Sequence, residues 1–299
     1  MKKSLHMIRK RNFWRNEVLL PGEEKTPQEN TRQKEKINPD NEVKGMLACA
    51  SAQSVGLQRE KNEDSLFKIC ASIVSGGQSI PFGIFIVADG MGGHQHGELA
   101  SAAAVEKFIE VAVKEIYGPE LQEENIKPVE EVESIIVNAV RQANQNVHAQ
   151  APGGGTTLTA AIVHGHSVTI AHIGDSRAYL YSQDGDLKLL TSDHSLVNKL
   201  VEIRQITEKQ AGTHPQRNIL LRALGNDINP EMDVFTQVFP ENSSLVLCSD
   251  GLWGVVPQDK IVKILDENPF LPDACKKLVD TANGMGGPDN ISVILVRHS

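Results

Sequence analysis

The chain has 299 residues, of which 40% are hydrophobic and 23% charged, and its formal net charge is −8. This is the composition of an ordinary folded protein with a sizeable core, and the acidic balance argues against non-specific binding to nucleic acid. The four cysteines have no CxxC spacing and lie mostly in apolar runs. We therefore expect buried, reduced thiols and no zinc site, which indicates the cytoplasm.

The N-terminal part of the chain differs from the rest. Residues 1–45 are rich in Lys, Arg, Glu, Gln, Asn and Pro and lack sustained hydrophobic periodicity. Such a segment buries too little apolar surface to offset the entropy of ordering it. The sequence predicts a mobile polar tail, followed by one domain over residues 46–299. It predicts no export signal and no membrane span, since no apolar stretch reaches the length of a bilayer.

The domain begins with two apolar segments around a charged run. Residues 46–51 predict a strand, and residues 66–74 predict the second strand of a hairpin-like pair. Arg59, Glu63 and Asp64 lie between them. An isolated charged run of this kind is normally a solvated turn.

The most informative stretch is Phe85–His94. The apolar run 82–88 predicts a buried strand that ends at Asp89, and the glycines that follow let the backbone approach a ligand closely. Taken alone, the Asp-Gly pair indicates only a turn. Apolar residues at helical spacing then predict a helix over 97–116 and a second over 132–147, each with one apolar stripe that covers a sheet.

The same pattern recurs further along the chain, because Asp175, Asp250 and Asp289 also lie at strand ends. Residues 153–157 read Gly-Gly-Gly-Thr-Thr, but they lack the lysine of a nucleotide-binding P-loop and precede a strand, so we expect no nucleotide site there. Strands at 168–173, 178–181 and 187–190 predict a meander. The looser pattern of residues 193–229 predicts a lid or small subdomain.

The acids at the strand ends are all oxygen donors, with no matching cluster of histidine or cysteine, and they are Glu63, Asp64, Asp89, Asp175, Asp250 and Asp289. Oxygen-only sites favour Mg²⁺ or Mn²⁺. So many converging carboxylates would repel one another without cations, whereas two divalent ions would neutralise them and hold a hydroxide for attack on phosphorus. Arg59 can bind phosphate oxygens in a bidentate manner.

Six motifs carry a family resemblance, and they occur in this order: Arg59–Asp64, Asp89–His94, Gly155–Thr157, Gly174–Arg177, Ser249–Trp253 and Asp289–Asn290. This series resembles the metal-dependent, type-2C protein serine/threonine phosphatases, in their bacterial branch, over about residues 46–297. The resemblance implies an α+β fold, a four-layer α-β-β-α sandwich of two antiparallel sheets flanked by helix pairs, with the metal cluster in a cleft at one end.

The resemblance also implies a role for each matched residue. Asp64 and Asp89 share in a site for two Mn²⁺ or Mg²⁺ ions, the Gly90 carbonyl binds one ion, and Asp250 and Asp289 bind the other. Glu63 acts through water, and Asp175 helps to hold a weaker third ion. Arg59 holds the substrate phosphate. Arg59, Asp64 and Asp89 are thus the expected catalytic residues. Residues 193–229 would be a flap beside the cleft that shapes substrate choice.

Two departures from the family pattern affect these expectations. Some relatives have a histidine after the Asp-Gly pair that can act as a general acid, and here that residue is Met91. We expect a structural role for His94 and protonation of the leaving oxygen by water. Some relatives carry a further acid where this chain has Gly254, which puts strong binding of a third metal in doubt.

The expected function is that of a phosphoprotein phosphatase in signalling, a monomer whose substrates are proteins phosphorylated by a serine/threonine kinase. Two alternatives stay open at this point. One is a catalytically weak module of the same fold that binds phosphoproteins, and the other is a phosphoesterase for small molecules. Turnover of a phosphopeptide compared with a small ester would distinguish the three.

Overall fold

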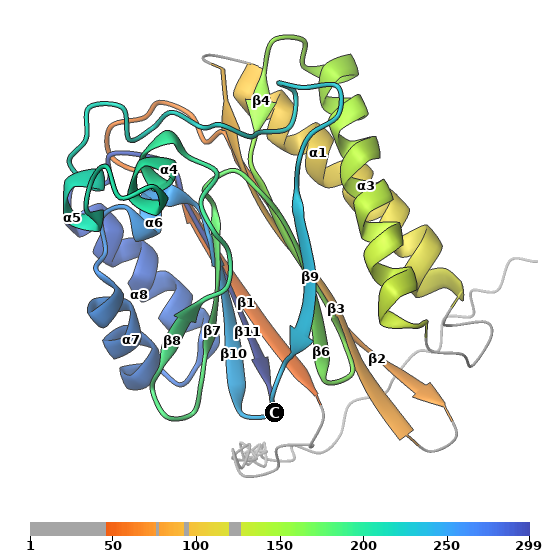
Figure 1. The fold of residues 1–299 in the computed structure, drawn as a ribbon. Coiled ribbons are helices and arrows are strands. Elements are labelled where there is room, and N and C mark those ends of the chain that lie inside the picture. Colours follow the sequence, from red (N-terminus) through yellow and green to blue (C-terminus); the bar gives the residue numbers. More distant parts are fainter. Residues whose placement is uncertain (1–45, 76–77, 93–95, 120–126) are drawn as a thin grey trace, which may run out of the picture. The chain divides into compact units, whose positions relative to one another are not determined.

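The computed structural model describes residues 46–75, 78–92, 96–119 and 127–299 (Figure 1). The predictions for residues 1–45 and for His94 lie outside the described residues. None of the helices described is both long enough and apolar enough to cross a bilayer.

Two antiparallel sheets form the centre of the domain. The first has the order β1 (Leu47–Ser54), β11 (Ile291–His298), β10 (Ser243–Cys248), β7 (Arg177–Tyr181) and β8 (Leu187–Leu189). The second has the order β2 (Asp64–Ser75), β3 (Gln78–Met91), β5 (Leu158–His164), β6 (Ser167–Ile173) and β9 (Asp233–Val238), and the short β4 (Gly155–Thr156) pairs with the end of β3.

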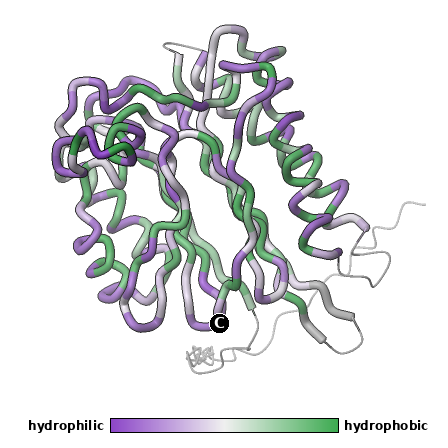
Figure 2. Tube along the Cα trace, viewed as in Figure 1, coloured by the Kyte–Doolittle hydropathy of each residue, from purple (hydrophilic) through white to green (hydrophobic). Residues whose placement is uncertain are grey.

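The side chains of the sheets alternate between two cores, as the two-residue period of a strand requires. On β3, Phe85 and Val87 pack between the sheets, whereas Phe82, Ile84 and Ile86 pack under the helices on the other face. Because both faces are covered, β3 reads as an almost continuous apolar run, which Figure 2 shows for several central strands. This explains why the sequence identified β3 so clearly.

Helices cover the outer face of each sheet (Figure 1). The second sheet is covered by α1 (His96–Ala112), which continues as the π-helical turn η1 (Val113–Tyr117), and by α3 (Val129–Gln150). The first sheet is covered by α7 (Gln258–Glu267) and α8 (Leu271–Gly284). The expected α-β-β-α sandwich and both expected long helices are therefore confirmed. Three short helices complete the described elements: α4 (Leu196–Glu202), α5 (Glu208–Ala211) and α6 (Asp250–Trp253).

Two expectations about strand pairing are wrong. The strands on either side of the charged run do not form a hairpin, because β1 pairs with β11 and β2 pairs with β3. The expected meander is also broken, since β6 belongs to the second sheet and β7 to the first. An alternating pattern shows which face of a strand is buried, but it does not identify the partner strand. As a result, residues 55–63 and 174–176 cross from one sheet to the other.

Candidate functional site

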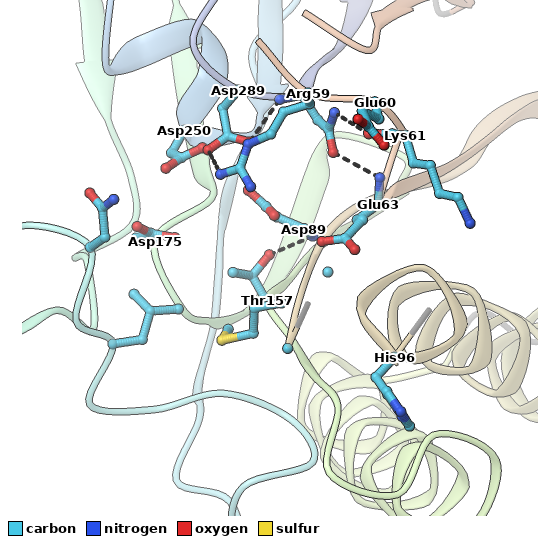
Figure 3. A pocket seen from close by; sticks show the side chains of 16 residues that line it. Arg59, Glu60, Lys61, Glu63, Asp89, His96, Thr157, Asp175, Asp250 and Asp289 are labelled. Carbon is cyan, nitrogen blue, oxygen red and sulfur yellow. Dashed lines mark hydrogen bonds and ion pairs between the residues drawn. The ribbon is translucent and has the colours of Figure 1, made fainter. Parts of the chain in front are cut away.

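A cavity of about 690 Å³ lies where these crossings meet the strand ends (Figure 3). Five of the acids that the sequence singled out line it: Glu63, Asp89, Asp175, Asp250 and Asp289. Arg59, Gly90 and Met91 line it as well. The structure therefore brings together residues that are more than two hundred positions apart in the sequence.

Asp64 lies at the base of this group, and its position follows from strand register. It is the first residue of β2 and stands opposite Asp89 on β3. The side-chain oxygen Oδ2 of Asp64 accepts hydrogen bonds from the hydroxyls of Ser249, at 2.8 Å, and Ser292, at 2.6 Å. Hydroxyl donors on a buried carboxylate favour its charged form. No local pattern in the sequence identifies these two serines as donors, since they meet only through the pairing of β10 with β11.

Asp89 occupies the middle of the acidic group. Its carboxyl is close enough to those of Asp64 and Asp250 to affect the pKa of both. Its backbone is fixed by the Gly-Thr-Thr segment, because its amide donates to Thr157 Oγ1 at 2.8 Å and its carbonyl accepts from Thr156 Oγ1 at 3.0 Å. Only a proton or a cation can join carboxyls placed in this way, since a carboxylate has no donor of its own.

Burial and mutual repulsion make these carboxyls unusually weak acids. Burial is the largest cause in each case, and it raises the pKa of Asp64 to about 6, of Asp175 to about 7 and of Asp250 to about 8. The pKa of Asp89 is raised well above its ordinary value, first by burial and then by the charge of Asp64. A site that holds so much negative charge in a desolvated place suits a strongly positive ligand.

Arg59 and Asp289 are also brought together, as an ion pair. The Arg59 guanidinium donates to Asp289 Oδ2 at 2.6 Å, and this hydrogen bond is the main reason why the pKa of Arg59 is raised. The expected phosphate-binding residue therefore contacts an expected metal ligand in this structure. The Arg59 side chain is 51% exposed, so its guanidinium stays accessible from the cavity.

Asn290 holds the segment that carries Arg59 and Glu63. Its side-chain amide donates to the carbonyls of Val55 and Lys61, both at 2.8 Å, and its carbonyl oxygen accepts from the Glu63 amide at 2.8 Å. One side chain at the start of β11 thus fixes both ends of the crossing. The sequence placed Asn290 in a motif but did not predict this role.

Glu63 and Gly90 meet the start of α1. The Gly90 amide donates to the Glu63 carbonyl at 3.2 Å, and a Cβ atom on Gly90 would lie only 2.2 Å from the Gly97 carbonyl oxygen. A Cβ atom on Gly97 would in turn lie 2.8 Å from Glu63 Oε2. The absence of side chains at both glycines lets strand, helix and carboxylate pack this closely. Glu63 therefore lies over the positive end of the α1 dipole.

Asp175 is held on the far side of the cavity from Glu63 (Figure 3). Its carbonyl accepts from Trp253 Nε1 at 3.0 Å, and the guanidinium of Arg177 lies 3.5 Å from the centroid of the Trp253 ring. Arg177 also makes two hydrogen bonds to Asp193, at 2.9 and 2.7 Å. This network ties Asp175 to the first residue of the segment 193–229.

The segment 193–229 reaches the cavity through Asn218 and Leu220, which line it. The segment is anchored at both ends, because the His194 amide donates to the Gly174 carbonyl at 2.7 Å and the Leu224 amide to the Thr156 carbonyl at 2.9 Å. Sequence reasoning predicted the segment but neither of these two lining residues. His96 also lines the cavity, and Figure 3 shows its ring apart from the acids.

The residues present fit divalent cations in their chemistry. Within the part of the chain that the structure describes, Oδ1 of Asp64 and Oδ1 of Asp250 are buried and receive no hydrogen bond. Across the same residues, no three or more acidic, histidine or cysteine side chains are grouped so that they could hold a metal ion as they stand. The orphaned oxygens and the all-oxygen donor set match the preference of Mg²⁺ and Mn²⁺.

The two antiparallel sheets bear an acidic, oxygen-lined cavity at their strand ends, and the guanidinium of Arg59 lies beside it. These features together are those of the metal-dependent phosphoester hydrolases. The comparisons agree with this class. The profile of the family described as Protein phosphatase 2C matches residues 58–283. The chain belongs to this family.

Individual relatives agree with the assignment. The chain is 40% identical over 222 residues to the serine/threonine phosphatase stp of Listeria welshimeri, covering 72% of this chain and 84% of the relative. A solved structure of the S. agalactiae serine/threonine phosphatase has a TM-score of 0.70 and 31% identity, and covers 85% of this chain and 100% of that one. The catalytic domain of the phosphatase PstP, solved in complex with two manganese ions, has a TM-score of 0.67 and 30% identity over 84% of this chain and 98% of its own.

Proposed function

We propose that this chain is a metal-dependent protein phosphatase that hydrolyses phosphoserine and phosphothreonine in proteins. The observation that carries this proposal is the grouping of the half-buried Asp89 with Asp64 and Asp250, with two orphaned carboxylate oxygens beside it. Such an arrangement destabilises a fold unless a cation compensates for it. The names of the bacterial relatives supply the substrate class, and the manganese-bound relative supports the kind of ion.

Each residue of the site has a distinct task in this proposal. Asp64, Asp89, Asp250 and Asp289, with the Gly90 carbonyl and with Glu63 acting through water, would hold two ions. When bound, the two ions neutralise the carboxylates and activate a water molecule for in-line attack on phosphorus.

The other groups bind and position the substrate. Arg59 is placed to bind the phosphate oxygens, because its guanidinium is half exposed beside the cavity. Ser249 and Ser292 keep Asp64 ionised through their hydrogen bonds. Met91 lines the cavity and has no proton to donate, so water would protonate the leaving seryl or threonyl oxygen.

Finer features belong to the same proposal. Either Mn²⁺ or Mg²⁺ fits the oxygen donors, and Asp175 would help to hold a weaker third ion, with Gly254 in the place of a further acid. The segment 193–229 would be the flap that selects substrates, which its two cavity-lining residues support. The expected substrates are targets of a serine/threonine kinase, and we expect a monomer. Four free cysteines support a reducing compartment such as the cytoplasm.

The test is the hydrolysis of a phosphothreonine peptide by the purified chain with Mn²⁺, repeated with a chelator and with Asp250→Asn. We expect turnover only for the wild-type protein with metal. The matched control is Asp184→Asn, which removes an exposed acid from the β7–β8 turn and should keep full activity.

Each alternative gives a different result in this test. Tight binding of the phosphopeptide without turnover would favour a binding module, and turnover of a small phosphate ester but not of the peptide would favour a small-molecule phosphoesterase. Turnover that survives both the chelator and Asp250→Asn would refute the metal mechanism.

A further inference from the structure

Two half-buried cysteines lie on the edge strands of the two sheets. Cys49 is on β1, the edge of the first sheet, and Cys70 is on β2, the edge of the second. Both side chains pack against the core between the sheets, Cys49 next to Leu47 in the alternation of β1, and Cys70 on the same face of β2 as Leu66. The strands themselves contact each other. The two thiols therefore meet across the open edge of the sandwich.

The two thiols act on each other, and they differ from the other two cysteines. Each thiol is the strongest influence on the pKa of the other. Both residues keep part of their surface exposed, whereas Cys248 and Cys275 are fully buried. The expectation that all four cysteines are buried is therefore wrong for this pair. We therefore expect a small reagent in solution to reach Cys49 and Cys70 without unfolding the domain.

The surroundings divide the two thiols into an ionised and a neutral partner. Interaction with Cys70 is the main reason why the pKa of Cys49 is lowered to about 7, and the positive charge of Lys68, on the same face of β2, contributes to this shift while burial opposes it. The same interaction raises the pKa of Cys70. Burial raises the pKa of Cys248 and Cys275 to about 12. Cys49 is thus the thiol that is present as the nucleophilic thiolate near neutral pH.

We propose that Cys49 and Cys70 are a redox modification site, a dithiol that hydrogen peroxide converts to a reversible disulfide between the two sheets. In the first step the Cys49 thiolate attacks a peroxide oxygen, so that an S–O bond forms, the O–O bond breaks and hydroxide leaves. In the second step the Cys70 sulfur attacks Cys49, forming the S–S bond as the sulfenic oxygen leaves as water and the Cys70 proton is taken up. Two thiols and one peroxide thus give one disulfide and two waters.

The disulfide would join parts of the chain that non-covalent contacts alone hold together. It would close a loop that includes the crossing with Arg59 and Glu63, and it would link two sheets through their edge strands. A link of this kind restricts the unfolded chain and raises the melting temperature. Cys49 and Cys70 are not part of the acidic cavity, so this inference does not depend on the proposed phosphatase activity.

The test uses the full chain, treated with hydrogen peroxide, then alkylated and digested for mass spectrometry. We expect one cross-linked peptide pair that contains Cys49 and Cys70, with the two buried cysteines unmodified, and we expect dithiothreitol to restore both thiols. The oxidised chain should melt several degrees higher than the reduced chain. The matched control is Cys275→Ser, which should still form the cross-link.

Single variants separate the two chemical steps. Cys70→Ser should leave Cys49 as a sulfenic acid that dimedone traps, and Cys49→Ser should leave Cys70 reduced under the same treatment. Peroxide that leaves all four cysteines free to alkylate would overturn the proposal. So would oxidation of Cys49 to the sulfinic acid while Cys70 of the wild-type chain stays free.

Discussion

The acidic cavity should make the metal-free protein less stable at neutral pH than its core would allow, and Asp250→Asn tests this directly. Burial is the main reason why the pKa of Asp250 is raised from 3.8 to about 8. A carboxyl whose pKa is raised by folding does not lower the free energy of unfolding while it is protonated in both the folded and the unfolded chain. The loss of unfolding free energy grows as the pH rises above 3.8 and is complete above about pH 8. Asparagine has a similar shape and never carries this charge.

The magnitude follows from the size of the shift. A difference of roughly four units corresponds to about 5 kcal/mol at pH 8, but to only about 2 kcal/mol at pH 5. Part of this energy belongs to pairs of acids rather than to Asp250 alone. The charge of Asp175 acts on Asp250, and the charges of Asp250 and Asp175 both act on Asp89. We therefore expect Asp250→Asn to stabilise the metal-free chain by about 2 to 4 kcal/mol more at pH 8 than at pH 5.

Urea unfolding followed by circular dichroism, with a chelator present, measures this difference. Asp184→Asn serves as the control, because that acid is exposed in a turn and should show no pH-dependent gain. With Mn²⁺ the advantage of Asp250→Asn at pH 8 should shrink, since only a chain with intact ligands gains about 2.7 kcal/mol at a metal concentration one hundred times the Kd. An equal effect of Asp250→Asn at both pH values, or a loss at pH 8, would refute the reasoning.

Three further predictions concern neighbouring groups. Arg59→Lys should raise the KM for a phosphopeptide several-fold, because lysine cannot bind phosphate in a bidentate manner. The affinity for Mn²⁺, measured by calorimetry, should stay close to wild type. An unchanged KM would argue against phosphate binding by Arg59. Ser292→Ala should weaken Mn²⁺ binding by about 1.5 to 3 kcal/mol, the value of a hydrogen bond to a charged group, and Ser243→Ala, in the same sheet, is the control. Burial lowers the pKa of His172 to about 3, so below pH 6.5 the unfolded chain takes up a proton that the folded chain does not. Lowering the pH from 6.5 to 4.5 should therefore cost the wild type about 2 kcal/mol of unfolding free energy that His172→Gln does not lose, and equal losses would contradict this.

The sequence alone was enough to find the acids of the cavity but not their contacts. Asp89 and Asp250 could be predicted because each follows a continuous apolar run and precedes glycine, a combination that places a carboxylate at a strand end. The position of Asp64 opposite Asp89 depends on the register of β2 against β3. A pattern of alternating residues does not fix that register by itself. The family resemblance supplied what the pattern could not.

The wrong hairpin between the first two strands shows the same limit. Both segments alternate in the manner of half-buried strands, and a short polar run separates them, so pairing them was the simplest interpretation. The structure pairs β1 with the last strand instead. Because long-range pairing is decided by the whole core rather than by the loop, no local feature of residues 55–63 could have revealed it. The contact between Cys49 and Cys70 depends on that arrangement and was therefore missed.

The glycine after Asp250 links the fold to the site, and replacing it tests whether close backbone packing positions the ligands. A Cβ atom on Gly251 would lie 2.0 Å from the Asn290 carbonyl oxygen. Backbone on both sides cannot rotate away, so Gly251→Ala should push α6 from the start of β11 and separate Asp250 from Asp289.

We expect this substitution to cost about 1 to 3 kcal/mol of unfolding free energy, as overpacking does, and also to weaken Mn²⁺ binding. Gly284→Ala is the matched control, because a Cβ atom there meets nothing within 4 Å at the end of α8. Helix propensity predicts that this control is neutral or slightly more stable. If urea unfolding and calorimetry gave both variants wild-type values, packing of α6 against Asn290 would not be what sets the position of Asp250.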